Sequence, residues 1–394
     1  EIYTLSLHDA LPIWSAGGKG MQNKVMSAAD AVKRFVKPGT HIAFGGFTIL
    51  RRPMAVAREV VRQGIGDLFV TMNGGTVVEE MLAGMGLVRW METTYIGMEG
   101  GMPVAYAVRR SIEEGAIELI EDYSNWSFAQ RTLAGRLGLP FMPCMANLGS
   151  DLLEYDVFGK AGLRGVREDG TWIHDGIPPK KYEVVDDPFD GFGLRPSRMH
   201  GKEDSCGNRT NRLLQTGRRS TRYTGKEGVK VLLVPPLKPE VSVIHVQRAA
   251  ADGTVRMEGL VGPDLDQALC ASTLIVECER LCPPEELRQV PEHNQIAPHF
   301  VKAIVVQPFG GYPTAVPNYY DYDYSWFQNY ARVVKGRSLQ GVREFWTEHV
   351  AETKDDWDYL ERAGGFEKLS SLRAVPGYGY NPSMTRFEKE GGAQ

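Results

Sequence analysis

In the first half of the chain, short apolar runs alternate with stretches whose apolar residues recur at helical spacing. The stretch 27–39, SAADAVKRFVKPG, begins with the capping residue Ser27 and is stopped by Pro38 and a glycine. The run HIAF at 41–44 is continuous and apolar, which is typical of a strand buried on both faces. This pattern predicts a helix followed by a buried strand.

The alternation continues for the next hundred residues. Helical stripes separate further apolar runs, which predict strands at 67–72, 88–97 and 116–123. Strands that alternate with helices through short connections indicate a parallel sheet covered by helices. Ligands bind such sheets at the carboxyl ends of the strands. We therefore expect four loops to lie along one edge of the sheet, namely 45–52, 73–75, 97–101 and 122–125.

The second half contains longer apolar strands of mixed direction. Asp252-Gly253 interrupts one of them and predicts a hairpin. Residues 319–394 carry aromatic helical stripes and then an irregular tail. The predicted fold class is α/β, an open and mostly parallel sheet covered by helices, with a mixed-strand C-terminal half.

Two segments do not fit this pattern. Residues 1–20 lack the basic start and apolar run of a signal peptide and are expected to be a non-native or disordered leader. Residues 191–226 hold nine Lys and Arg among small polar residues without apolar periodicity. We expect them to be a disordered basic insertion, or a local reading-frame error, within one domain at 21–384. Residues 385–394 form a tail.

Composition narrows the functional class. The net charge of −4 argues against a chain devoted to nucleic acid or to an anionic membrane. Five cysteines in a chain of 394 residues do not suggest a disulfide framework. Cys278 and Cys282 have no second pair of ligands at zinc-site spacing, so no metal is predicted. No apolar stretch approaches membrane-spanning length, and we expect a cytoplasmic protein.

The sequence GGFTILRRP that follows the first strand is the main candidate for chemistry. It lacks both the dinucleotide-binding and the P-loop spacing. A tight strand-to-helix turn remains, formed by Gly45, Gly46 and Phe47, whose N–H groups could bind a phosphate or hold an oxyanion. Arg51 and Arg52 stand at a helix start, where positive charge is disfavoured by the dipole, which points to an anionic partner. A purely structural turn is the alternative.

Other polar residues follow neighbouring strands. Asn73 and Ser124 could donate hydrogen bonds to a substrate or could cap ordinary turns. Glu99 lies in a glycine-rich loop and is a candidate nucleophile or base, although lining the site or facing solvent is the simpler role. Packing is the simpler role for three tyrosines and a strand histidine, namely Tyr312, Tyr319, Tyr320 and His245.

Several of these motifs, in one order, resemble the α subunits of family I coenzyme A transferases. The motifs are GGFTILRRP, DLFVTMNGG, TTYIGMEGG, EDYS, QPFGGYPT, NYYDYD and VPGYGY. Within that family the chain is most similar to the α (A) subunits of the glutaconate CoA-transferase group. The resemblance covers about 21–189 and 228–384.

The resemblance implies ping-pong chemistry that needs a second chain. In the family a glutamate of the β chain, in an S-E-N-G motif, forms an acyl–glutamyl anhydride and then a glutamyl–CoA thioester. This chain has no S-E-N-G. The resemblance therefore implies an α subunit that has no nucleophile of its own and works with a β subunit. It also implies that coenzyme A is a substrate rather than a tightly bound cofactor. The substrates would be an acyl-CoA and a carboxylic acid, with a dicarboxylic acid as one option.

Two alternatives remain open from sequence. A ring-opening acyl-CoA hydrolase uses the same two-subunit scaffold, but its α subunit carries a glutamate near the stretch that here reads EDYSNW, where Ser124 and Asn125 stand. A non-catalytic module that binds a ligand at the same sheet edge is the second alternative. Free CoA released without an acceptor acid would indicate the hydrolase.

Overall fold

The computed structural model describes residues 23–98, 104–120, 123–189 and 230–384. The predicted leader at 1–20, the insertion at 191–226, the tail at 385–394 and the candidate Glu99 lie outside the described residues.

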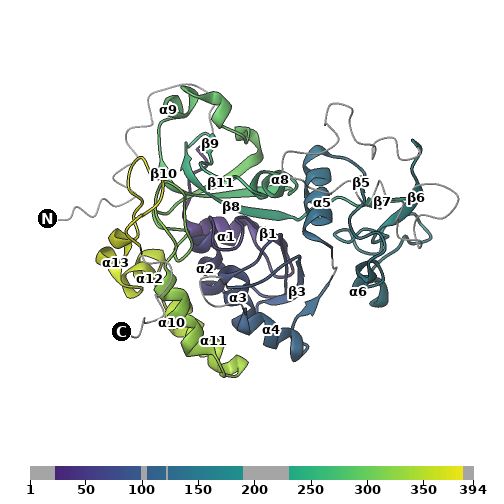
Figure 1. The fold of residues 1–394 in the computed structure, drawn as a ribbon, viewed down its shortest axis with the longest axis horizontal. Coiled ribbons are helices and arrows are strands. Elements are labelled where there is room, and N and C mark those ends of the chain that lie inside the picture. Colours follow the sequence, from purple (N-terminus) through teal and green to yellow (C-terminus); the bar gives the residue numbers. More distant parts are fainter. Residues whose placement is uncertain (1–22, 99–103, 121–122, 190–229, 385–394) are drawn as a thin grey trace, which may run out of the picture.

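An open sheet forms the centre of the molecule (Figure 1). Its strand order is β11-β10-β8-β1-β2-β3-β4, neighbours in this order run parallel, and β9 pairs antiparallel with β8. The strands are β1 (His41–Phe44), β2 (Leu68–Met72), β3 (Val88–Thr93), β4 (Glu118–Leu119), β8 (Val241–Ala249), β9 (Val255–Arg256), β10 (Thr273–Leu281) and β11 (Val301–Val306). The predicted open, mostly parallel sheet is confirmed, as is the hairpin at Asp252-Gly253.

Helices cover both faces of this sheet. One face packs against α1 (Ala28–Phe35), α2 (Met54–Arg62), α3 (Val77–Gly84) and α4 (Tyr106–Glu113), through the largest apolar core. The other face carries α5 (Asn125–Leu137) and α8 (Asp264–Leu269). Side chains alternate between the faces, so Ile42 and Val70 enter the first core while His41 and Phe69 lie on the opposite face.

The C-terminal helices lie along the lower left side of the view, next to α3 and α4 (Figure 1). The aromatic-rich C-terminal part folds as α10 (Tyr324–Val334), α11 (Leu339–Trp346), α12 (Asp356–Arg362) and α13 (Gly365–Ser371). Elsewhere lie α6 (Val157–Lys160) and α9 (Pro284–Arg288), three 3₁₀ turns at Asp151–Leu153, Pro291–His293 and Pro298–Phe300, and a π turn at Thr347–Ala351. No helix within the described ranges is long and apolar enough to cross a membrane.

A small antiparallel sheet was not predicted. It consists of β5 (Met142–Cys144), β6 (Glu183–Asp186) and β7 (Lys230–Val234), in the order β5-β7-β6. The apolar run at 230–234 pairs with 183–186, which precede the segment 190–229, and Glu183 lies opposite Leu233. The two flanks of the predicted insertion therefore form one antiparallel pair.

Two predicted strands are shorter in the structure. β3 ends at Thr93, because the following residues turn to bond the 73–76 loop, with Gly75 N–H donating to the Tyr95 carbonyl at 2.9 Å. Among the described residues of the run at 116–123, which exclude 121–122, only Glu118–Leu119 form a strand, at the edge of the sheet and with Glu118 exposed. Pattern alone overestimated both lengths, since apolar residues continue past the last paired position.

Candidate functional site

The double-glycine turn after β1 packs against the protein's own atoms. A Cβ on Gly45 would lie 2.6 Å from Asp264 Oδ1, and one on Gly46 would overlap the Leu50 carbonyl oxygen. Gly46 also has a φ of +81°, which strains other residues. Both glycines are buried, whereas Phe47 is 39% exposed. Because glycine has no Cβ, Asp264 and Leu50 can approach the turn closely at these two positions. Phe47 is the residue of the turn that faces outward.

The N–H groups of this turn are used inside the protein. Gly45 donates to the Val243 carbonyl at 2.7 Å, and Gly46 donates to the Asp264 carboxylate. The Phe47 N–H donates to the Leu50 carbonyl at 3.0 Å, and the Thr48 N–H donates to the Gly74 carbonyl at 3.1 Å. The predicted oxyanion or phosphate cradle therefore has no free backbone donor here, and that part of the interpretation is corrected.

Arg51 is buried and holds a neighbouring loop. Its guanidinium donates to Asp264 Oδ2 at 2.5 Å, to the Val261 carbonyl at 2.8 Å and to the Glu258 carbonyl at 3.2 Å. The residue has a φ of +50°, an uncommon conformation for a side chain of this size. Such backbone persists where surrounding contacts determine it, and here the contacts run to the 258–264 loop.

Arg52 is fully buried and joins the glycine turn to the next loop. It donates to the Glu79 carboxylate and lies 3.4 Å from the carbonyls of Gly46 and Gly74. Burial raises the pKa of Glu79, although Arg52 and the Thr76 N–H, which donates at 2.7 Å, counteract it.

The sequence argument for an anionic ligand took both arginines as unpaired at a helix start. Each is neutralised by a buried carboxylate instead. The disfavoured helix-start position of these positive charges is therefore explained by internal ion pairs, and it gives no evidence for a ligand.

Asn73 and the start of α5 are brought together by a threonine. The Thr94 hydroxyl contacts the Asn73 carbonyl and the Asn125 side chain, and lies 3.2 Å from Asn73 Oδ1. The hydroxyl of Ser124 caps α5, accepting the Ser127 N–H at 3.2 Å. Asn73 after β2, Thr94 after β3 and the start of α5 therefore lie together at one edge, while Ser124 has the capping role. Most of the predicted loop 97–101 lies outside the described residues.

A cavity of about 340 Å³, here called the loop cavity, opens at this edge. Its lining comes from the turn after β1, the end of β2, one side of α5 and the 260–266 segment. The lining residues are Phe47, Leu50, Arg51, Asn73, Ala129, Thr132, Leu260, Val261, Gly262, Pro263 and Asp266. Three of the predicted site residues, Phe47, Arg51 and Asn73, thus line one cavity, in a volume suited to part of a coenzyme or a small acid.

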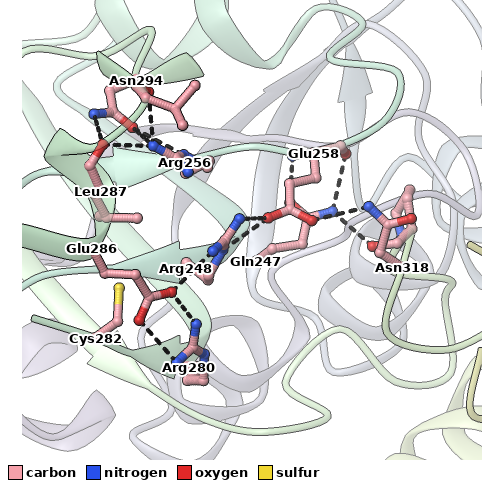
Figure 2. Close-up of polar contacts among 12 residues, drawn as sticks. Gln247, Arg248, Arg256, Glu258, Arg280, Cys282, Glu286, Leu287, Asn294 and Asn318 are labelled. Atoms are coloured by element: carbon pink, nitrogen blue, oxygen red, sulfur yellow. Dashed lines mark hydrogen bonds and ion pairs between the residues drawn. The ribbon is translucent and has the colours of Figure 1, made fainter. Parts of the chain in front are cut away.

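A polar network fixes the start of the 258–264 loop (Figure 2). The Glu258 carboxylate accepts from Arg248 Nε at 2.8 Å and from Asn318 Nδ2 at 2.9 Å. Gln247 Nε2 donates to the Glu258 carbonyl at 3.0 Å, beside the bond from Arg51. Since this loop forms one wall of the loop cavity, the network sets the position of that wall.

His245 lies behind the site in a buried cluster. Its Nδ1 is 2.7 Å from Glu277 and its Nε2 is 2.8 Å from Glu279. Burial pushes the pKa of His245 down, but the hydrogen bonds to the two carboxylates outweigh it and raise the pKa to about 9. Tyr320 donates to Glu279, and Tyr312 donates to Asp323, so both tyrosines are buried packing residues, as is His245.

Sequence reasoning missed the residues that organise the site. Asp264, Glu79 and Thr94 hold the loops in place. Asp264 and Glu79 belong to no motif that was singled out, whereas Thr94 lies in TTYIGMEGG without having been proposed for a role. Glu79 did carry a local signal, because it stands three residues after Thr76 in a capping-box pattern. Within the described part of the chain, no group of three or more His, Cys, Asp or Glu could hold a metal ion.

Comparison with known proteins gives consistent matches. The family model for coenzyme A transferase matches residues 25–307. The A subunit of glutaconate CoA-transferase from Acidaminococcus fermentans is 33% identical over 93% of this chain and 100% of its own length. The A subunit of a 3-oxoadipate CoA-transferase from Pseudomonas knackmussii is 26% identical over 84% of this chain and 95% of that protein. The crystal structure of glutaconate CoA-transferase from Acidaminococcus fermentans superposes with a TM-score of 0.73 at 33% identity, covering 91% of this chain and 98% of that one.

Proposed function

This chain belongs to the coenzyme A transferase family, and from that premise we propose that it is the α chain of a two-chain enzyme that moves CoA between an acyl-CoA and a carboxylic acid. The observation that carries the proposal is the end-to-end similarity to the α chain of such an enzyme, which covers that relative's entire length. A chain of this extent corresponds to one of the two chains, so the partner has to supply the rest of the active site.

We assign the nucleophile to the partner, because this chain lacks the S-E-N-G motif that carries it in the family that the chain resembles. A glutamate carboxylate of the partner chain attacks the thioester carbonyl, and the CoA thiolate leaves as a mixed anhydride forms. The thiolate then attacks the glutamyl carbonyl, which releases the first acid as a carboxylate and leaves a glutamyl–CoA thioester. The acceptor acid reverses these steps, so CoA is transferred with no net loss of the thioester.

In this proposal the loop cavity is the wall that the α chain contributes to that site. Phe47 and Asn73 meet the substrate, while Arg51 and Arg52 keep the walls in place through Asp264 and Glu79. Water has to be excluded, because it would hydrolyse the anhydride and destroy the thioester. The exposed ring of Phe47 at the cavity is suited to that role when the partner covers it.

A dicarboxylic acid is the proposed acceptor class. Two relatives that match most of the chain are named for glutaconate and 3-oxoadipate, and both of these acids carry two carboxylates. The buried arginines give no independent support for this choice, since internal carboxylates already neutralise them. The choice of acid therefore rests on similarity alone.

The test is co-expression with the chain encoded by the neighbouring reading frame, provided that chain carries an S-E-N-G-like loop. The purified pair should exchange CoA between acetyl-CoA and glutaconate, whereas this chain alone should not. Borohydride reduction of the acyl-CoA-treated pair should modify the partner only. Free CoA formed without an acceptor acid would instead indicate a hydrolase, and absence of any acyl-CoA reaction would indicate a binding module.

A further inference from the structure

The 258–264 loop, which forms one wall of the loop cavity, is held at both of its ends. Its inner residues, 259–263, form neither helix nor strand. Arg51 contacts both ends, because it donates to the Glu258 carbonyl at 3.2 Å and pairs with Asp264. Gln247 Oε1 also accepts the Glu258 N–H at 2.8 Å. The position of the loop is therefore set by its two end residues.

The middle of this loop is an apolar wall. Leu260, Val261 and Pro263 line the loop cavity, and Leu260 is 73% exposed. Gly259 and Gly262 have φ values of +76° and +58°, which glycine adopts without strain. An exposed apolar side chain beside a cavity is stabilised when a ligand covers it. The wall is therefore suited to the carbon chain of a substrate rather than to a carboxylate or a phosphate.

The Glu258 side chain joins the start of the loop to two other segments (Figure 2). Its carboxylate accepts from Arg248 Nε on β8 at 2.8 Å and from Asn318 Nδ2 at 2.9 Å. Asn318 directly follows Pro317, and a Cβ on Gly259 would lie 2.8 Å from Pro317. The carboxylate thus keeps Pro317 packed against the first inner residue of the loop. Loss of this carboxylate should loosen the wall at that point.

Arg248 also holds a second carboxylate, which does not contact the loop. Its Nη1 donates to Glu286 Oε1 at 3.0 Å, and Glu286 accepts from Arg280 as well (Figure 2). Glu286 lies in α9 and is not among the described residues that line the loop cavity. The side chains of Glu258 and Glu286 are 21% and 31% exposed. One arginine therefore forms two ion pairs of similar exposure, of which one reaches the cavity wall.

We propose that Glu258 is a positioning residue for CoA transfer, which holds Leu260 and Val261 in contact with the carbon chain of the acid. This inference rests on the proposed function. In a ping-pong exchange, the donor's acyl group and the acceptor acid occupy the same place in turn, because both react with the same glutamate carboxyl. A wall that contacts only the carbon chain contributes to binding and not to the chemical step, so its position affects KM rather than kcat.

The test uses Glu258→Ala in the complex with the partner chain, with acetyl-CoA as donor and glutaconate as acceptor. KM for glutaconate should rise about fivefold, which is the effect of one partly exposed ion pair. KM for acetyl-CoA should change less, because its acyl group has only a methyl group to contact the wall. The value of kcat should stay within about twofold of the parent's.

Two further variants separate position from stability. Glu286→Ala breaks the other ion pair of Arg248 and should leave both KM values unchanged. Glu258→Gln keeps an oxygen that can accept from Arg248, and it should remain close to the parent. Thermal unfolding should show small and similar losses of stability in the two alanine variants, so a difference in KM between them reports the position of the wall.

Four results would overturn this inference. With a parent complex that transfers CoA, these are an unchanged KM for glutaconate in Glu258→Ala, the same rise in Glu286→Ala, or a fall in kcat alone. An equal rise in KM for both substrates would assign the wall to CoA instead of the acid. These results leave the proposed function intact, whereas a parent complex that transfers no CoA would overturn both.

A second variant covers the case in which Glu258→Ala does not fold. Asn318→Gly removes one of the two side-chain contacts of Glu258, at a φ of +71° that glycine tolerates. It should raise KM for glutaconate in the same direction and by a smaller factor. An unchanged KM in that variant would show that Pro317 and Asn318 do not hold the wall.

Discussion

The guanidinium of Arg51 and the carboxylate of Asp264 form an ion pair of 2.5 Å, in which neither side chain is more than 1% exposed. Asp264 uses its other oxygen to accept the Gly46 N–H. One carboxylate therefore holds both ends of the turn that follows β1. The same contact joins this turn to the 258–264 loop, so the pair fixes two walls of the loop cavity relative to each other.

Removal of the Asp264 charge should destabilise the fold strongly. Asp264→Asn leaves the Arg51 guanidinium buried without a counter-charge, and breaking a buried ion pair in this way costs about 3 to 5 kcal/mol. Urea unfolding followed by circular dichroism measures the loss. The matched control is Asp266→Asn, which breaks the half-exposed pair with Arg136 and should cost less than about 1 kcal/mol. Similar losses for both variants would contradict this role of Asp264.

A side chain at Gly46 should not be tolerated. Gly46→Ala introduces a Cβ at a φ of +81° that also overlaps the Leu50 carbonyl, so the left-handed penalty of about 1 to 2 kcal/mol is increased by a backbone displacement. Gly64→Ala is the control, since its φ is +62° and nothing lies within 4 Å of the added atom. The free energy of unfolding should fall by about 1 kcal/mol in the control and by clearly more in Gly46→Ala. Equal losses would show that the close packing of the turn is unimportant.

Stability should fall with rising pH because of His245. Its pKa is about 9 in the folded chain and about 6.5 in the unfolded chain. Between these values the folded state keeps a proton that the unfolded state has released, so the stabilisation is complete below pH 6.5 and is lost as the pH rises through 9. The expected loss is on the order of 3 kcal/mol. Urea unfolding at pH 6, 7.5 and 9 measures it.

The control for this titration is a second histidine. His299 is exposed in the 3₁₀ turn Pro298–Phe300, so His299→Gln controls for the loss of a histidine without disturbing the Glu277 and Glu279 contacts. His245→Gln should flatten the profile in the alkaline range. A parent protein whose unfolding free energy is constant from pH 6.5 to 9 would show that the Glu277 and Glu279 contacts do not hold the proton.

Local sequence pattern predicted the main parallel sheet but not the contacts that form the site. The buried strand at 41–44 and the loops after β2 and β3 could be predicted, because periodicity and turn residues act over a few positions. Arg51 and Asp264 lie 213 residues apart, and Arg52 and Glu79 lie 27 apart. No local pattern reports such a pairing, so the arginines looked available for a ligand.

The small sheet also shows that local pattern does not predict which distant segments pair. The apolar run at 230–234 has the composition of a central strand. In the structure it pairs with Glu183–Asp186 on one side and with Met142–Cys144 on the other. Pairing between distant strands is set by the overall packing of the molecule. Composition of a single strand therefore predicts that it pairs, without predicting the strand that it pairs with.

Loss of the Phe47 ring should impair catalysis without unfolding the chain. The ring is 39% exposed, lines the loop cavity and packs over Gly74, where an added Cβ would lie 2.8 Å from it. In the complex with the partner chain, Phe47→Ala should reduce kcat/KM for CoA transfer about tenfold, through lost contact and entry of water. Its melting temperature should stay close to that of the parent, since the exposed part of the ring contributes little to the core.

The control for Phe47 is Phe366, which is 81% exposed on α13 and lies outside the loop-cavity lining. Phe366→Ala should retain full transfer activity. The ratio of free CoA to transferred CoA adds a second measurement, because a water-accessible site hydrolyses part of the anhydride and Phe47→Ala should raise that ratio. Unchanged kcat/KM and an unchanged ratio would mean that Phe47 lies outside the reacting region, and the loop cavity would then not be the wall that this chain contributes to the transferase site.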